Sequence, residues 1–194
     1  MAKRPLTAGE IALAKTVFGG SIDYAAVRLH DRRVLPPGIQ HKHQAVAKGN
    51  DISFPRTAYS DDFSTETNAS KQSVFIHELV HVWQHQNNVV STFREAVKET
   101  LKHKFNYGKC YLYKLDAHLD LVQYGFEQQA AMIQDYFLLS RHNETKSFKN
   151  RRIDAAQPGL QQKYEAVLKK FLRDPLYAKG ARDTRRNRNP KGPH

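Results

Sequence analysis

The chain has 194 residues, of which 40% are hydrophobic, a length and composition typical of one globular domain with a real core. No apolar run reaches the roughly 18 residues that a transmembrane helix needs, and the basic start MAKRPLTAGE lacks the apolar segment of a secretory signal. The single cysteine, Cys110, excludes an internal disulfide framework and favours synthesis in a reducing cytoplasm, with Cys110 expected as a half-buried strand residue.

The net charge of +12 favours anionic partners, but it is unevenly distributed along the chain. Residues 179–194 hold six Lys or Arg and one Asp, so +5 of that charge belongs to the C-terminal end. This segment lacks large apolar side chains and carries Gly and Pro, which predicts a basic, disordered tail after a single domain over residues 1–178. Because no aromatic-interleaved basic motif accompanies the charge, nucleic acid is not the expected partner.

Capping residues and hydrophobic periodicity predict the helices and strands of the chain. Thr7 and Glu10 have the spacing of a capping box, ahead of a helix that ends near Phe18 at Gly19-Gly20. Strands are predicted over residues 25–30, 51–55 and 111–115, with a loop over 31–50. Further helices are predicted over about 71–87, 92–104, 125–140 and 160–173. The fold class is therefore α+β and mostly helical.

Three of these helices carry more detailed expectations. The helix over 71–87 should begin at an N-cap formed by Ser70, with Asn68 nearby. The helix over 125–140 should direct four residues to the core, namely Phe126, Ala130, Ile133 and Phe137. The last helix should have one apolar face, formed by Leu160, Tyr164, Val167, Leu168 and Phe171.

Residues His77-Glu78-Leu79-Val80-His81 form an HExxH motif inside the apolar run SVFIHELVHVW. Histidines four residues apart on a helix lie one turn above each other, so both imidazoles can reach one ion at about 2.0–2.1 Å, the zinc–nitrogen distance. Glu78 follows the first histidine and can act as general base on a metal-activated water. Since His and Glu are costly to bury without partners, this apolar setting favours a zinc site over a chance match.

A catalytic zinc takes a third protein ligand. His85 lies about 12 Å from His77 along the helix axis, which is too far to share the ion. Gln84 and Asn87 stand where the extended motif HExxHxxGxxH has Gly and His, so that class is excluded. Glu127 is the best candidate, because it is an isolated acid in an apolar, Ala-rich predicted helix.

Weaker alternatives are kept open. Glu95 and Glu99 lie on a predicted helix that is charged all round, which favours a solvated role. His41 and His43 could form a second metal site, but their Pro/Gly-rich surroundings favour a solvated loop.

The residues that support the ligands are also left open. The candidates for accepting the second N–H of a ligand histidine are Asp116, Asp120 and Asp135. The unranked candidates for a donor to the oxyanion are Tyr107, Tyr113, His118 and Tyr124.

The block HELVHVWQHQ followed by YGFEQQAAMIQDYF resembles a family of bacterial zincin-like domains, which occur alone or as C-terminal extensions of type VI secretion spike proteins. The opening RPLTAGEIALAKTVFGGSIDYAAVRLH and the block GNDISFP are also similar, so the resemblance covers about residues 4–140. It implies a zincin-like fold with short strands packed on the active-site helices. It departs from larger gluzincin peptidases at Ala131, where those enzymes carry an Asp one turn after the ligand glutamate.

The resemblance implies zinc ligands at His77, His81 and Glu127, with Glu78 as general base of a metallopeptidase. It also implies an antibacterial effector, made in the bacterial cytoplasm without a signal peptide and delivered by contact into a neighbour's envelope or periplasm. The expected partners are a protein or peptide substrate, a secretion spike protein and an immunity protein. The alternatives are a zinc amidase or endopeptidase acting on peptidoglycan, and an inactive zincin-like secretion adaptor.

Overall fold

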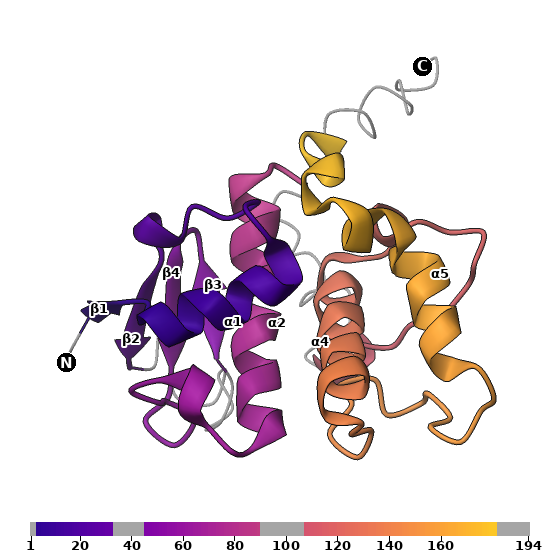
Figure 1. The fold of residues 1–194 in the computed structure, drawn as a ribbon, viewed down its shortest axis with the longest axis horizontal. Helices are drawn as coiled ribbons and strands as arrows, with labels where there is room; N and C mark the ends of the chain where they lie inside the picture. The colour runs from indigo at the N-terminus through magenta and orange to yellow at the C-terminus, as the bar shows by residue number, and fades with distance from the viewer. Residues whose placement is uncertain (1–2, 33–44, 90–106, 182–194) are drawn as a thin grey trace, which may run out of the picture.

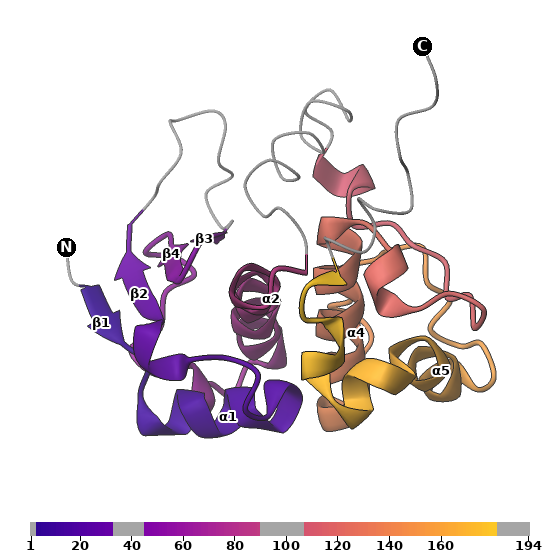
Figure 2. The same cartoon turned by 90° about the horizontal axis from the view of Figure 1, so that it is seen from above.

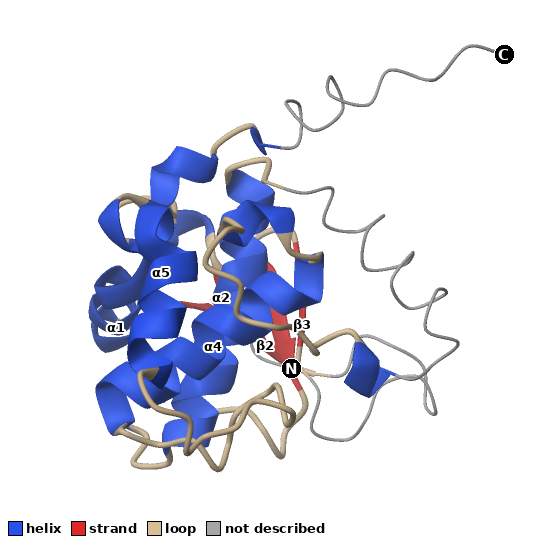
Figure 3. Ribbon diagram, turned by 90° about the vertical axis from the view of Figure 1, so that its right-hand side faces the viewer, coloured by secondary structure: helices blue, strands red, loops and turns tan. Residues whose placement is uncertain are grey.

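The structure is a computed structural model that describes residues 3–32, 45–89 and 107–181. Its α-helices are α1 (Ala8–Phe18), α2 (Ala69–Gln86), α4 (Phe126–His142) and α5 (Leu160–Arg173). Its strands are β1 (Lys3–Pro5), β2 (Arg28–Asp31), β3 (Val46–Lys48) and β4 (Asp51–Phe54). Short 3-10 helices occur at Tyr24–Ala26, Phe63–Thr65, Tyr107–Lys109, Leu121–Gln123 and Pro175–Ala178. This is the predicted α+β, mostly helical fold (Figure 3).

The four strands form a small mixed sheet in the order β1-β2-β4-β3. β2 and β4 run parallel in the centre, where Leu29 pairs with Ile52, and the two outer strands run antiparallel to them. β4 confirms the strand predicted over 51–55, whereas β2 begins three residues later than predicted, after a 3-10 turn. The prediction of loop over 31–50 was wrong for β3, a three-residue strand too short to show alternation.

Helix α2 is the central element of the molecule. Figures 1 and 2 place it between the sheet on one side and α4 and α5 on the other. Every residue from Phe75 to Gln84 on α2 is buried, because the helix is covered on both faces. A helix buried in this way must be apolar nearly all round, which explains the run that surrounds HExxH.

The helix ends follow the capping chemistry of the sequence. At the start of α1, the Thr7 side chain accepts the N–H of Glu10 at 3.0 Å, and the Glu10 carboxylate accepts the N–H of Thr7 at 2.9 Å. This confirms the predicted capping box. Helix α2 begins two residues earlier than predicted, because Asn68, not Ser70, is its N-cap and accepts the Ser70 N–H at 2.9 Å.

The apolar faces predicted for α4 and α5 are buried as expected. Trp83 on α2 lies fully buried with its ring edge-on to Phe171 of α5, and the Phe171 ring also meets Phe18 of α1. These contacts join three helices in one hydrophobic core.

The strand predicted over 111–115 was wrong, because this segment is irregular. Side chains take the place of a partner strand. The carbonyl of Leu112 accepts the side-chain amide of Gln128 at 2.6 Å, and the carbonyl of Tyr113 accepts that of Asn150 at 2.8 Å. The alternation of buried and exposed side chains that resembled a strand therefore comes from a segment without a partner strand, which is held by side-chain hydrogen bonds. Cys110, expected in a strand, lies buried in a turn just before it.

Some expectations fall outside the described residues. These are the helix over 92–104, the loop residues 33–44 and the tail from residue 182 onward. The domain limit at residue 178 stays a prediction. No helix among the described residues is long and apolar enough to cross a membrane.

Asp135 on α4 is fully buried and anchors the segment that follows the helix. Its carboxylate accepts the hydroxyl of Tyr113 at 2.7 Å, the backbone N–H of Asn150 at 3.0 Å and the backbone N–H of Lys149. The Tyr113 hydroxyl also meets that of Tyr164 at 2.7 Å. Burial raises the pKa of Asp135 to about 6, although these donors act in the opposite direction.

This pKa predicts how Asp135 affects stability. A carboxyl with a raised pKa binds its proton more tightly in the folded state, so its contribution to stability falls as the pH rises from about 4 to about 6. Asn does not titrate, so the unfolding free energy of the wild type minus that of Asp135→Asn should fall by roughly 3 kcal/mol as the pH rises over this range. Urea unfolding of both proteins from pH 3.5 to 8 measures the difference, and a pH-independent difference would contradict the prediction.

Candidate metal centre

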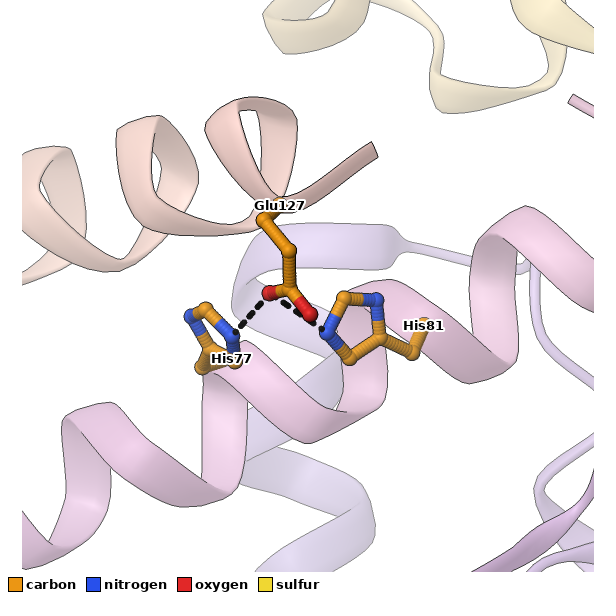
Figure 4. A group of neighbouring side chains, drawn as sticks. All are labelled: His77, His81 and Glu127. Carbon is orange, nitrogen blue, oxygen red and sulfur yellow. Dashed lines mark hydrogen bonds and ion pairs between the residues drawn. The ribbon is translucent and has the colours of Figure 1, made fainter. Parts of the chain in front are cut away.

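The two motif histidines lie one turn apart on α2, both buried against α4. Figure 4 shows their imidazoles on the same face of the helix, directed toward the first turn of α4. The ring centroids are 5.0 Å apart and the planes are nearly perpendicular. Both Nε2 atoms therefore face one common point between the helices.

Glu127 reaches this point from the first turn of α4 (Figure 4). Its Oε2 atom lies 3.3 Å from Nε2 of His77 and 3.3 Å from Nε2 of His81. Ligands at 2.0–2.1 Å from a tetrahedral ion are about 3.3 Å from one another, so these separations fit such an ion. One ligand atom from each of the three residues lies within 4.8 Å of the others, and the group could hold a metal ion.

His81 is oriented by Gln84, one turn further along α2. The side-chain oxygen of Gln84 lies 2.9 Å from Nδ1 of His81, and since an amide oxygen only accepts, Nδ1 carries the hydrogen. The Gln84 amide nitrogen donates to the carbonyl of Phe126 at 3.1 Å and to the side chain of Gln129 at 2.9 Å, which fixes the amide orientation. The Nε2 lone pair of His81 is thereby left for a cation.

Two aromatic rings enclose the histidines. The ring of Phe126 stacks on His81 with centroids 4.2 Å apart, and the ring of Tyr111 meets His77 edge-on at 5.8 Å. The second nitrogen of His77, Nδ1, is buried without a hydrogen-bond partner among the described residues. At Nδ1, His77 is thus held by packing alone, whereas His81 is held there by a hydrogen bond.

The three candidate ligands perturb one another strongly. Burial acts to lower the pKa of His81, but the carboxylates of Glu127 and Glu78 outweigh it and raise this pKa to about 9. Burial lowers the pKa of His77 to about 4, and the positive charge of His81 acts in the same direction. Burial acts to raise the pKa of Glu127, but the two histidines hold it well below its usual range. The group therefore holds a cationic His81 beside an ionised Glu127 near neutral pH.

Glu78 lies on the sheet side of α2, close to the ligands. Burial raises its pKa to about 7, and a hydrogen bond from the backbone of Ala47 in β3 acts against this rise. One of its carboxylate oxygens, Oε2, is buried with no hydrogen-bond partner among the described residues. A carboxyl with a pKa near neutrality can both accept and return a proton.

The acids expected to support the histidines have other partners. Asp135 is bonded to Tyr113 and the segment after α4, so that alternative is wrong. Asp120 caps a 3-10 helix and accepts the hydroxyl of Tyr177, and Asp116 caps the turn before it. Gln84 takes the supporting role for His81. The sequence did hold an indication of this role, because Gln84 follows His81 by three residues and side chains three apart on a helix can meet.

Of the four candidates for an oxyanion donor, two have engaged hydroxyls. The Tyr113 hydroxyl bonds to Asp135, and the Tyr124 hydroxyl donates to the carbonyl of Lys114 at 2.9 Å. His118 is exposed in a turn. Tyr111, which the sequence reasoning missed, contacts His77 directly.

The side chains of the remaining alternatives lie outside the part of the chain that the structure describes. Tyr107 opens a 3-10 helix, and its side chain is not among those described. Glu95, Glu99, His41 and His43 lie outside the described residues.

The raised pKa of His81 predicts that a metal displaces a proton. A bound cation requires neutral His81, whose pKa is about 9, so binding at pH 7.5 should release about one proton. Calorimetric titration with Zn²⁺ in buffers of different ionisation enthalpy counts the protons. Binding without proton release would show that His81 is neutral beforehand or is not a ligand.

The bond between Gln84 and His81 predicts a supporting role in metal affinity. Replacing Gln84 with Met keeps the volume but removes the acceptor, so Zn²⁺ affinity should fall on the order of 10- to 100-fold. Competition with a chelating dye measures this affinity. Gln134→Met is the matched control, since Gln134 is a buried amide of α4 that donates to Ser73 of α2 and, within the described part of the chain, forms no hydrogen bond with either histidine. Equal losses in both variants would indicate general loosening of the helix contact.

Three similarities place the chain among known proteins. The family described as eCIS core domain matches residues 5–89. Over 138 residues the chain is 41% identical to the type VI secretion system spike protein VgrG2b of Pseudomonas aeruginosa PAO1, an alignment that covers 71% of this chain but 13% of that protein. The solved structure of the effector domain of Pseudomonas aeruginosa VgrG2b matches with a TM-score of 0.64 and 38% identity, over 78% of this chain and 82% of that domain.

These similarities confirm the resemblance to a domain of type VI secretion spike proteins that the motif blocks indicated. The chain spans a small part of the spike protein but most of its effector domain. The chain belongs to the family of the VgrG2b effector domain.

Proposed function

We propose that this protein is a zinc-dependent hydrolase of peptide bonds. The observation that carries the proposal is the convergence of His77, His81 and Glu127 on one point, with the buried carboxyl of Glu78 beside them. Two imidazoles and a carboxylate are the donor set of many catalytic zinc sites, which leave one position open. Zinc is preferred to calcium or magnesium, because those ions take oxygen ligands.

The residues support a general-base mechanism. When bound, zinc would supply a Lewis acid and make a water acidic enough to react near neutral pH. Glu78 accepts the proton of the attacking water and passes it to the leaving amine, a role that suits a pKa of about 7. Gln84 keeps Nε2 of His81 directed at the metal position throughout.

The position of β3 supports a peptide as substrate. β3 forms one edge of the sheet, contacts α2 and reaches Glu78 through the backbone of Ala47. An extended peptide can add to such an edge through main-chain hydrogen bonds. It would then pass close to Glu78 and the two histidines.

The relatives support a biological role. One is named a type VI secretion spike protein, and the solved domain is named its effector domain. We infer that this chain acts as an antibacterial effector that reaches the envelope or periplasm of a target cell by contact-dependent secretion. A spike protein and an immunity protein are the partners that this role requires.

The charge favours one second candidate, hydrolysis of peptidoglycan cross-links. A net charge of +12 suits an anionic cell wall. Digestion of purified sacculi, run beside a panel of unfolded proteins, separates the two candidates by the products released.

Glu78→Gln tests the mechanism. The amide keeps the size of the side chain but cannot take a proton, so hydrolysis should fall about 10²- to 10⁴-fold while zinc content is unchanged. Elemental analysis and turnover are measured on the same preparations, with Glu165→Gln as the control. Glu165 lies on α5 and bonds to Tyr136 and Gln161, away from the ligands. Undiminished hydrolysis by the Glu78 variant would refute the role of Glu78.

A further inference from the structure

Lys149 is a half-buried cation beside the candidate metal centre. Its Nζ atom lies 4.0 Å from the centroid of the Tyr111 ring, an arrangement that holds the ammonium group by a cation–π contact. Within residues 3–32, 45–89 and 107–181 no carboxylate forms an ion pair with it. A half-buried ammonium group held against a ring, with no carboxylate beside it in the described part of the chain, can bind an anion from outside the protein.

The backbone of Lys149 is held firmly by buried groups. Asp135 accepts the N–H groups of Lys149 and Asn150, and the Asn150 side chain donates to the carbonyl of Tyr113 at 2.8 Å. This network ties the Lys149 segment to the segment that carries Tyr111. The ammonium group and the ring that supports it are therefore positioned by one buried network.

Lys149 is close enough to the site to act on it. The Tyr111 centroid is 5.8 Å from that of His77 and 4.0 Å from Nζ, so Nζ lies within about 10 Å of the His77 ring. Beyond the effect of burial, the charge of Lys149 acts to lower the pKa of both His77 and Glu78. Nζ rests against the Tyr111 ring and not against the ligands, so it is set back from the position of the reacting carbonyl.

We propose that Lys149 is a specificity-determining residue that binds a carboxylate of the substrate next to the scissile bond. The preferred substrates are then acidic peptides, with the carboxylate on the side chain of the residue whose carbonyl is attacked. The proposal rests on the proposed function, because it requires a substrate at the metal centre. A substrate carboxylate would supply the anion that Lys149 lacks and would offset its repulsion from the bound metal.

A pair of hydroxamates tests this directly, without turnover. N-acetyl-glutamyl hydroxamate and N-acetyl-glutaminyl hydroxamate share a metal-binding group and differ in one side-chain carboxylate. Binding of each to the zinc-loaded full chain is measured by calorimetry. The wild type should bind the glutamyl probe about tenfold more tightly, and Lys149→Met should abolish this preference.

Two variants control for indirect effects. Lys149→Arg retains the charge and should keep the preference. Lys146→Met removes an exposed lysine three residues away and should leave the preference unchanged. Thermal unfolding of each variant shows that it is folded. If Lys149→Met does not fold, the preference is compared in Lys149→Gln, where its survival would overturn the proposal.

The outcomes distinguish the role of Lys149 from the presence of a working metal centre. Equal binding of both probes by the wild type, or a preference that survives in Lys149→Met, overturns the role of Lys149 and leaves the metal centre intact. Failure of both probes to bind the zinc-loaded protein overturns the proposed hydrolase site and this role together, whereas a chain that does not take up zinc overturns the metal centre itself.

Discussion

The structure depends on one contact, the meeting of α2 with the first turn of α4. There one carboxylate oxygen of Glu127 lies 3.3 Å from each of two imidazoles that are about 50 residues earlier in the chain. Three polar side chains buried in an otherwise apolar contact are costly unless a cation or a proton joins them. Without a metal, a proton on His81 joins the three side chains, and the raised pKa of His81 reflects this. A metal ion can take the place of that proton.

The surroundings make this contact rigid in two different ways. On one side Gln84 binds His81 and, through Gln129 and the carbonyl of Phe126, ties the end of α2 to the beginning of α4. On the other side His77 has an aromatic wall, Tyr111, and no hydrogen-bond partner for its Nδ1 among the described residues. The hydrogen bond fixes the direction of the His81 ring, and packing against Tyr111 limits the movement of the His77 ring.

The polar groups around the centre are divided between two sides of α2. Toward the sheet, Glu78 approaches β3, and burial raises its pKa to about 7. Toward the helical half, Asp135 holds the segment that carries Lys149. In the proposed function, a substrate lying between them would meet the acid–base group Glu78 on one side and the positive charge of Lys149 on the other.

Several features could be predicted from the sequence because they depend on neighbours along the chain. The helical spacing of His77 and His81, the capping box at Thr7 and the apolar face of α5 all follow from periods of three to four residues. Glu127 could also be selected, since an isolated acid in an apolar helix needs a partner. The mostly helical α+β class followed from the same periodicity.

Other features were decided only by the tertiary structure. The strand predicted over 111–115 is irregular because side chains from α4 and residue 150 bind its carbonyls, and β3 is too short to leave a pattern. Gln84 looked like a departure from a longer motif, yet its amide links His81 on its own helix to Gln129 on α4. The positions of Tyr111 beside His77 and of Lys149 against the Tyr111 ring depend on contacts between segments far apart in the sequence, and local periodicity carries no information about such contacts.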